Sequence, residues 1–398
     1  MVKLINFKNN KFPLTIVIFL IISLYLILEF FFKKNSLLIF LFIFLFIIIL
    51  AEILFRFFYK LIKKSSYNFI EKVPFSKIYI ESHPYLSYVC KKNFRQQGDN
   101  KIVNYPLKKV LINNLTSNNL GFFNGPDGSR NVEVPKPQNL IRINCLGAST
   151  TGNYVSQNKT NYSYPLILEN ILKKKYRNKI EVNNCGQGGY NSADLLIRYM
   201  LQIVDTEPDY LIIYHAYNDI RSYLTPGFMS DYSHSRRNIG ERIWRFSLNE
   251  IIPDIPLKLF NYLKAKYIVG DVRNSLLDLV SKGDINTKLD FSLGLKVYER
   301  NIQNIIYLAK KNNTKVILCT FVVFLYNELK KDPLHILYKK IVEKENQIMK
   351  DLSKKNKIQL VDCDLLIPRK KEYFLDTIHF SIEGMKILAK LIESSIKI

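Results

Sequence analysis

Cysteine and acidic residues are scarce in this chain of 398 residues, and their scarcity argues against several classes of protein. The five cysteines are odd in number and form no Cys-x-x-Cys pair, which argues against a disulfide framework and a thiolate zinc site. Four of them lie in apolar, strand-like runs, where free cysteine packs as a small hydrophobe: Cys145, Cys185, Cys319 and Cys363. The sequence therefore predicts reduced cysteines, which fits a reducing compartment.

The shortage of acidic residues leaves the chain strongly basic, with a formal net charge of +24 and an isoelectric point near 9.6. The basic residues are spread along the chain, and there is no Arg-rich arm, zinc-ligand spacing or RNP-like string. These absences argue against nucleic acid as a partner. Much of the Lys, Asn and Ile content is typical of an AT-rich genome. The remaining interpretation is a basic surface close to an anionic membrane.

Long apolar runs are concentrated in the first sixty residues. Residues 14–32 form a run of about 19 residues, the length needed to cross a bilayer, and residues 37–58 form a second run. The polar sequence Lys-Lys-Asn-Ser separates the two runs, and no small-residue cleavage site precedes it, which argues against a secretory signal peptide. We therefore expect residues 1–64 to form a transmembrane hairpin in the lipid bilayer.

Cations flank the two ends of this hairpin more heavily than its turn. Cytoplasmic flanks of spanning helices carry an excess of Lys and Arg. The turn between the two helices carries only Lys33 and Lys34, whereas the two outer ends of the hairpin carry Lys3, Lys8, Lys11, Arg56, Lys60, Lys63 and Lys64. The sequence thus predicts an integral membrane protein with both termini and the large domain on the cytoplasmic side.

The rest of the chain divides into a preceding segment and a main domain. Residues 65–138 have Pro, Asn and Gly punctuation and no long helical period, so we expect an irregular segment that packs on the main domain. The main domain is expected at residues 139–398. Within it, residues 230–290 lose the alternation seen elsewhere and are expected to form a cap-like insertion.

Short apolar runs alternate with helical patterns through the main domain. This alternation predicts a parallel sheet covered by helices on both faces. The expected strands are 141–146, 180–184, 210–214, 315–323 and 358–361, and the clearest helical patterns are 164–176 and 192–204.

Two distant motifs carry residues suited to nucleophilic catalysis. Ser149 follows the first predicted strand and so lies at the carboxyl end of the sheet, where open α/β proteins bind ligands. Asp376 precedes His379 by three residues, so one short loop allows the carboxylate to orient the imidazole, which can then deprotonate a serine. Each motif alone is compatible with a helix cap, at Ser149 or at Asp376 or Ser381. Together they indicate an acyl-transfer site.

Two further loops follow predicted strands. Gly186 follows the second strand, and glycine lets a backbone N–H approach a ligand closely. Asn218 follows the third strand, and its amide could donate to a developing oxyanion. Either loop could equally be a simple turn. The neighbouring His215 lacks the carboxylate spacing of His379 and is better explained as a hydrogen-bonded core residue.

The four motifs in order resemble those of the SGNH/GDSL hydrolase family. That family has a serine after the first strand, a glycine after the second, an asparagine after the third and Asp-x-x-His near the C-terminus. The resemblance covers roughly residues 140–396 and implies a flavodoxin-like three-layer α/β/α fold. It also implies a nucleophile, a base, an orienting carboxylate and an oxyanion hole, which are respectively Ser149, His379, Asp376, and the group of Ser149 N–H, Gly186 N–H and Asn218 side chain.

This chain departs from the family pattern at two positions. The usual Gly-Asp-Ser has Ala148 in its centre, and the Gly of Gly-x-Asn-Asp is Ala216. Neither position has a role in proton transfer or oxyanion binding, so the chemistry is expected to survive. The shape of the substrate pocket is what these changes affect.

The sequence thus predicts a membrane-anchored serine hydrolase that cleaves an acyl or acetyl ester on a small molecule, glycan or lipid through an acyl-enzyme. No metal or organic cofactor is required, and His83, His234 and His335 show no metal-ligand spacing with one another. Two alternative functions are compatible with the same sequence: an O-acyltransferase with a sugar hydroxyl as acceptor, and a catalytically idle membrane scaffold. Enzymes similar to this one often act on cell-envelope glycans, which would favour an extracytoplasmic (periplasmic) domain instead.

Overall fold

The computed structural model describes residues 79–81, 83–95, 101–112, 116–152, 155–157, 160–176, 179–224, 228–232 and 291–397, with Ser23, 44–46 and Leu50. The chain divides into two compact units, Met1–Phe75 with Trp244–Gly270, and Ser76–Ile243 with Asp271–Ile398. The predicted spanning helices, apart from those few positions, and nearly all of the predicted insertion lie outside the described residues. Within the described ranges no helix combines the length and apolar character that a membrane span requires.

A five-stranded parallel sheet forms the centre of the second unit. Its strands stand in the order β8-β5-β9-β10-β11, which is 2-1-3-4-5 in chain order, the order of flavodoxin-like folds. The strands are almost wholly buried, as expected for a sheet covered on both faces. Their bounds are β5 Ile141–Gly147, β8 Ile180–Asn184, β9 Tyr210–Tyr214, β10 Lys315–Cys319 and β11 Gln359–Val361.

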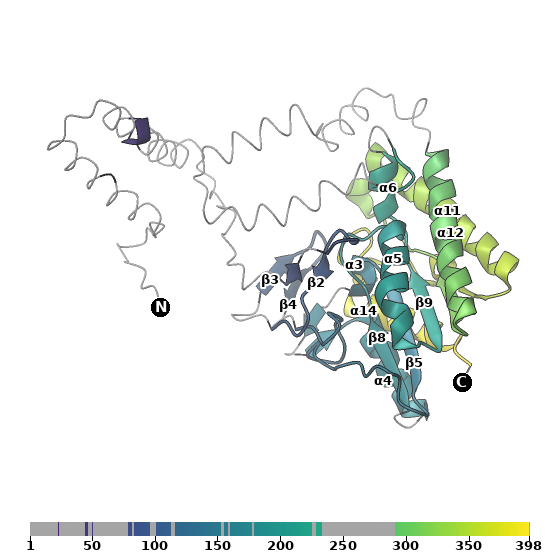
Figure 1. Ribbon diagram of the computed structural model, residues 1–398. Helices are drawn as coiled ribbons and strands as arrows, with labels where there is room; N and C mark the ends of the chain where they lie inside the picture. The colour runs from purple at the N-terminus through teal and green to yellow at the C-terminus, as the bar shows by residue number, and fades with distance from the viewer. Residues whose placement is uncertain are drawn as a thin grey trace. The chain divides into compact units, whose positions relative to one another are not determined.

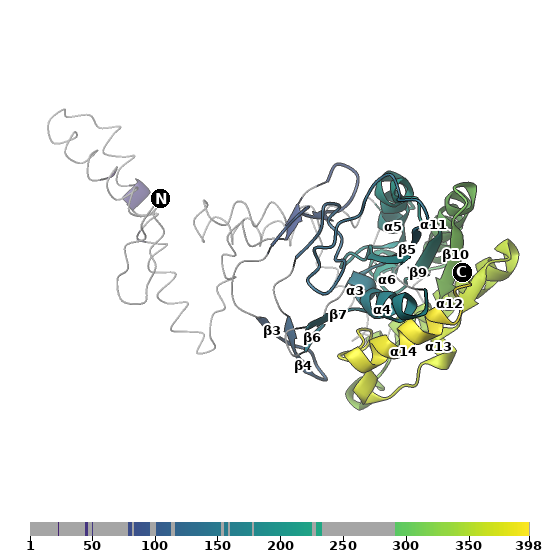
Figure 2. The ribbon, with the colours of Figure 1, turned by 90° about the horizontal axis from the view of Figure 1, so that it is seen from below.

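Helices cover the two faces of this sheet. On one face α4 packs against β8 and against α14; on the other, α11 packs beside α5, α12 and β10. Figure 2 shows α5 and α11 on one side of β5 and β9, with α4 and α14 on the opposite side. The bounds are α4 Tyr164–Tyr176, α5 Ser192–Arg198, α11 Ser292–Lys311, α12 Pro333–Asn356 and α14 Ile382–Glu393. The prediction of an α/β parallel sheet covered by helices is confirmed.

The strand order brings the loops that follow β5 and its two neighbours together at one edge of the sheet. The chain leaves β5 for β8 on one side and then crosses to β9 on the other (Figure 1). The register pairs Cys145 with Asn184 and Gly147 with Tyr214, so the carboxyl ends of these three strands are neighbours. Loops that follow them meet at this edge, the usual ligand-binding position of an open α/β sheet.

Several predicted boundaries match and others shift for identifiable reasons. The strands at 180–184 and 210–214 and the helix at 164–176 have the predicted bounds. The helix predicted to reach residue 204 ends as α5 at Arg198 and continues as a π-helical turn. β10 stops at Cys319 because the side chain of Asn346 bonds both the N–H and the carbonyl of Phe321, taking the chain out of the strand ladder.

The segment before the main domain contains strands, which corrects the expectation of an irregular segment at 65–138. It has β1 (Ile80–Glu81) paired with β2 (Val89–Cys90), and β3 (Lys101–Asn104) paired with β4 (Lys109–Ile112). Strands of two to four residues are too short to show a readable alternation of apolar and polar side chains.

A second hairpin lies between the short helix α3 (Ser149–Gly152) and α4, and was not predicted. It consists of β6 (Val155–Gln157) and β7 (Thr160–Tyr162). β4 pairs with β6 through Leu111 and Ser156, giving an antiparallel sheet in the order β3-β4-β6-β7. This sheet therefore joins the preceding segment to the region directly after Ser149.

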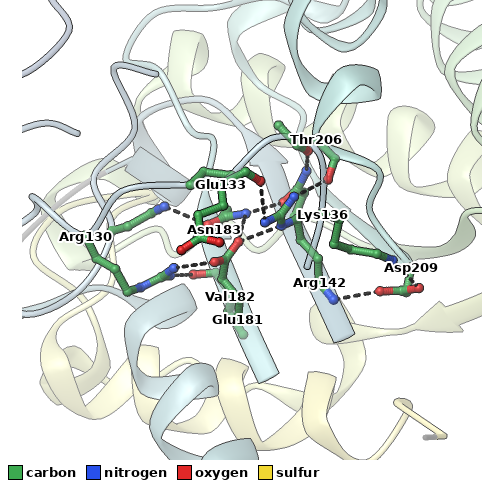
Figure 3. A network of polar contacts seen from close by, with 12 residues as sticks. Arg130, Glu133, Lys136, Arg142, Glu181, Val182, Asn183, Thr206 and Asp209 are labelled. Atoms are coloured by element: carbon green, nitrogen blue, oxygen red, sulfur yellow. Dashed lines mark hydrogen bonds and ion pairs between the residues drawn. The ribbon is translucent and has the colours of Figure 1, made fainter. Parts of the chain in front are cut away.

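A buried arginine fastens the preceding segment to the central sheet (Figure 3). The Arg142 side chain, 0% exposed, lies on β5 and donates to Glu181 on β8 at 2.7 Å. Its other nitrogens donate to the carbonyl of Thr206 at 2.5 Å and to the carbonyl of Glu133 at 2.9 Å. Arg130 bonds Glu181 from the preceding segment at 3.0 Å. One guanidinium thus links four chain segments at the amino ends of the strands.

We expect Arg142→Met to destabilise the protein by about 3–5 kcal/mol, because it leaves the buried carbonyl of Thr206 without its donor and removes one of the two arginines that pair with Glu181. The matched control is Lys136→Met, which removes a pair with Asp209 whose side chains are 19% and 38% exposed. That variant should lose less than about 1 kcal/mol. Urea-unfolding midpoints of the two variants and the wild type measure the difference, and equal losses would contradict the assignment.

Candidate active site

Ser149 is presented by a tight turn between β5 and α3. β5 ends at Gly147, and Ser149 opens the helix after one intervening residue. A Cβ added at Gly147 would lie 2.5 Å from the carbonyl oxygen of Tyr214 on β9 and 2.2 Å from Thr151 Oγ1. Only glycine therefore lets the chain turn here so close to β9. The turn leaves Ser149 half-buried at the carboxyl edge of the sheet.

The loop before α14 holds Asp376 and His379 in a fixed relation. Asp376 Oδ1 accepts from the N–H of Ile378 at 2.8 Å and from the N–H of His379 at 2.7 Å. Its second oxygen contacts His379 Nδ1 at 2.7 Å. The loop is closed by the N–H of Leu375, which donates to the carbonyl of His379 at 2.8 Å. Ser381, and not Asp376, caps α14 through the N–H of Gly384.

The structure brings the three residues predicted as a triad together. His379 Nε2 lies 2.9 Å from Ser149 Oγ, across 230 positions of sequence. The side chains of His379 and Asp376 are 17% and 19% exposed, so the site is sheltered but open to solvent. Burial opposes ionisation of Asp376, but the bonds that it accepts from His379 and the loop outweigh burial and lower its pKa. The carboxylate is therefore charged beside the imidazole at neutral pH.

A second Asp-x-x-His sequence shows that this spacing alone does not create such a site. At the start of α12, Asp332 accepts from the N–H of His335 at 2.9 Å and contacts its Nδ1 at 2.8 Å. The same two groups of the histidine are contacted as in Asp376 and His379, although one oxygen of Asp332 makes both contacts. Asp332, however, serves as the N-cap of α12. The serine at the edge of the sheet distinguishes one loop from the other.

Gly186 has a different environment from the one expected of an oxyanion donor. Its N–H donates to Asn184 Oδ1 at 3.1 Å. A Cβ there would lie 2.2 Å from the backbone nitrogen of Gly152, so this glycine permits two loops to touch. The part of the loop that approaches Ser149 comes later: a Cβ on Gly188 would lie 3.9 Å from Ser149 Cβ. Among the described residues, the N–H groups of Ser149, Gly188 and Gly189 have no acceptor.

Tyrosines of the preceding segment and of the second loop fix this turn. Tyr88 donates from its hydroxyl to the carbonyl of Gly188, and Tyr190 donates to the carbonyl of Tyr88. The two tyrosine rings meet edge to face at 5.7 Å. In a planar trans peptide the carbonyl and the following N–H point in opposite directions. Tyr88 therefore sets the direction of the Gly189 N–H, at a residue whose φ is +77°.

Asn218 joins the second and third loops. It opens α6 (Asn218–Tyr223), and its Nδ2 donates to the carbonyl of Tyr190 at 2.9 Å. A primary amide has two N–H donors, so one remains for a ligand. The preceding residue, Tyr217, has a φ of +72°, which turns the chain sharply at the end of β9.

Sequence reasoning missed Glu345, which supports this loop from α12. One of its oxygens accepts from the N–H of Tyr217 at 3.2 Å and the other from the hydroxyl of Tyr223 at 3.0 Å. Complete burial and the nearby charge of Asp219 raise the pKa of Glu345 to about 8. The available signal was a glutamate in the apolar stripe of α12, between Ile341 and Met349.

His215 lies in a separate buried cluster, as expected for a core residue. Its Nε2 contacts Asp219 at 2.7 Å, and the side chain is 1% exposed. Asp219 also accepts from the hydroxyls of Ser192 at 2.5 Å and Tyr232 at 2.6 Å. Asn301 on α11 donates to Ser192 at 2.9 Å. This cluster ties α5, α6 and α11 together beneath the loops. In the described part of the chain, no group of three His, Cys, Asp or Glu residues could hold a metal.

Residues 145–387 match the sequence profile of the GDSL-like lipase/acylhydrolase family, over more than half of the chain. The chain belongs to this family. The matched range contains every residue of the predicted triad and oxyanion hole, whereas β1 to β4 lie before it. Family membership makes the protein a hydrolase of the class that acts on ester bonds.

Solved structures similar to this family member include hydrolases from three bacteria. An acetylxylan esterase from Geobacillus stearothermophilus is 17% identical with a TM-score of 0.40, covering 65% of this chain and 95% of its own. A lipase/acylhydrolase from Enterococcus faecalis is 14% identical with a TM-score of 0.39, covering 64% and 94%. A putative GDSL-like lipase from Parabacteroides merdae is 14% identical with a TM-score of 0.39, covering 66% and 97%. No curated protein matches the sequence.

Proposed function

We propose that this family member is a serine hydrolase that cleaves an acyl or acetyl ester through a covalent acyl-enzyme, with a glycan or lipid as the substrate class. One observation carries the proposal: the continuous contact from Asp376 through His379 to Ser149, with 2.7 Å and 2.9 Å between the polar atoms. A carboxylate, an imidazole and a hydroxyl in this order can deprotonate the hydroxyl as it attacks a carbonyl.

The reaction follows from these contacts. Ser149 Oγ attacks the ester carbonyl while its proton passes to His379 Nε2, and Asp376 stabilises the imidazolium that forms. The tetrahedral intermediate collapses when His379 gives the proton to the leaving alkoxide, releasing the alcohol. Water then enters, loses a proton to His379 and attacks the acyl-enzyme. The acid leaves and Ser149 regains its proton.

The oxyanion of the tetrahedral intermediate needs donors at the same edge of the sheet. We assign this role to the N–H of Ser149, the free amide hydrogen of Asn218 and the turn at Gly188 and Gly189. The sequence analysis gave this role to Gly186, but the N–H of Gly186 already donates to Asn184. We therefore assign the role to the turn instead. The turn approaches Ser149, and its peptide is oriented by Tyr88. Donors held in place before the reaction stabilise the developing charge without reorganisation.

We expect a fluorophosphonate to label wild-type protein at Ser149 alone, and Ser149→Ala and His379→Ala to abolish labelling. Ester hydrolysis by either variant should fall by at least about 10⁴-fold, since the three residues act as a unit. Peptide mass mapping and an ester panel that includes acetylated glycans measure both effects. The panel should include a sugar acceptor, because acyl transfer to it in place of hydrolysis would make the protein an O-acyltransferase.

Two variants serve as matched controls for this experiment. Thr150→Val removes the neighbouring hydroxyl, which has no hydrogen-bond partner among the described residues. His335→Ala removes the imidazole of the Asp332–His335 loop. Both should keep labelling and activity. Labelling that persists in Ser149→Ala would refute the assignment, and a wild type inert to every probe would favour the scaffold alternative.

For Asn218→Ala we expect kcat to fall by roughly 10²–10³-fold, the usual effect of removing one oxyanion donor. KM should change less than kcat, because the bond strengthens mainly in the transition state. Steady-state kinetics on one ester measure the two parameters, and the thermal unfolding midpoint controls for loss of the bond to Tyr190. A near-normal kcat would reduce Asn218 to a turn residue.

We propose further that residues 1–64 anchor the enzyme in the membrane, with the hydrolase domain in the cytoplasm. The supports are the two apolar runs at 14–32 and 37–58 and their cationic flanks. The full chain should stay in the pellet after alkaline carbonate extraction, and protease added to intact spheroplasts should leave the domain uncut. Release into the supernatant would contradict anchoring, and digestion without lysis would place the domain on the outer side.

A further inference from the structure

A turn outside the family-matched range touches the loop that carries the base. The β3–β4 turn, residues 105–108, precedes the matched region by more than thirty positions. The N–H of Leu107 in this turn donates to the carbonyl of Leu375 at 3.0 Å. The N–H of Leu375 in turn donates to the carbonyl of His379. The turn is therefore hydrogen-bonded to this loop at Leu375, the residue between Asp376 and Phe374, and Phe374 forms an isolated β-bridge.

The aromatic residue of this turn faces the imidazole. The ring of Tyr105 lies 5.8 Å from the ring of His379, centroid to centroid, with 59° between the planes. Tyr105 is half-buried, so part of the residue is exposed to solvent. Beyond the turn, Leu107 and Lys108 line a cavity of about 480 Å³ with Phe374, Lys371, Glu372 and Glu383.

The β3–β4 turn is attached both to the Ser149 side and to the His379 side of the site. On the far side of β4, Leu111 pairs with Ser156 of β6, and β6 starts three residues after α3 ends. The β3-β4-β6-β7 sheet is thus linked by the chain to Ser149 and by hydrogen bonding to the His379 loop. A sheet attached at two points is a rigid support for a specificity contact.

The mechanism tells which part of an ester lies next to Tyr105. His379 must give its proton to the leaving alkoxide, so the alcohol part of the ester lies on the His379 side of Ser149. The acyl part lies on the other side of the carbonyl, next to the oxyanion donors. A ring beside His379 is therefore placed nearer to the alcohol than to the acyl group.

We propose that Tyr105 is a specificity-determining residue that forms an aromatic wall for the alcohol part of the substrate and selects alcohols carrying a ring, such as a sugar. The inference rests on the proposed hydrolase function. Aromatic side chains offer a large, flat apolar surface at small entropic cost, which suits the C–H face of a sugar ring better than a short alkyl chain. The wall comes from the segment that precedes the family's shared domain, so the selectivity belongs to this chain.

The experiment compares two acetate esters that share an acyl group, an acetylated methyl glycoside and ethyl acetate, on the full-length enzyme. In Tyr105→Ala, kcat/KM for the glycoside should fall roughly 3- to 10-fold, whereas that for ethyl acetate should change less than about 2-fold. Tyr105→Phe should restore the preference because it keeps the ring. Tyr105→Leu keeps apolar bulk without a ring and should lose the preference as Tyr105→Ala does. It provides the test if the alanine variant does not fold.

Three further measurements separate this proposal from others. Hydrolysis of the common acetyl-enzyme should be unchanged in all Tyr105 variants, since the alcohol has already left. Tyr307→Ala, which removes an exposed tyrosine on α11, should leave the preference intact. If the wild type reacts but Tyr105→Ala loses kcat/KM equally for both esters, or for neither, the aromatic wall is overturned. A wild type that cleaves neither ester and is not labelled at Ser149 would instead overturn the hydrolase function.

Discussion

The hydrogen bond between His379 and Ser149 is the constraint on which the rest of the site depends. It joins residues 230 positions apart, and its 2.9 Å length requires the end of β5 and the loop before α14 to be held at one edge of the sheet. The parallel sheet supplies this geometry because β5 is flanked by β8 and β9, whose loops meet beside it. Gly147 allows the serine turn to lie against β9, and the Asp376 bonds keep the imidazole facing the serine.

Buried polar groups hold this arrangement from beneath. Glu345 fixes the backbone before Asn218, and Asp219 gathers the side chains of α5, α6 and α11. At the opposite end of the strands, Arg142 joins β5 to Glu181 and to the carbonyl of Thr206. Buried polar groups of this kind are costly unless they are fully bonded, so each network fixes one arrangement of the segments that it joins. The reactive side chains are placed by groups that take no part in the chemistry.

The segment before the family-matched range contacts the candidate active site. Tyr88 orients the turn at Gly188, and the β3–β4 turn bonds the His379 loop and brings Tyr105 against the imidazole. The inserted hairpin β6–β7 extends the same antiparallel sheet to the end of α3. We propose that this segment adds a wall to the family's fold, on the leaving-group side of the site.

The sequence by itself determined the order of strands and helices and the identity of Ser149, Asp376 and His379. Apolar runs such as 210–214 and the Asp-x-x-His spacing are local patterns, so they are readable without a fold. Only the tertiary structure brings the Asp376–His379 loop against the serine and leaves the Asp332–His335 loop at the start of α12. It also shows the N–H of Gly186 bonded to Asn184, and it reveals the contacts of Glu345, Tyr88 and Tyr105. These contacts join segments far apart in the chain, so the sequence pattern does not show which groups meet, even where it marks a polar residue such as Glu345 in an apolar stripe.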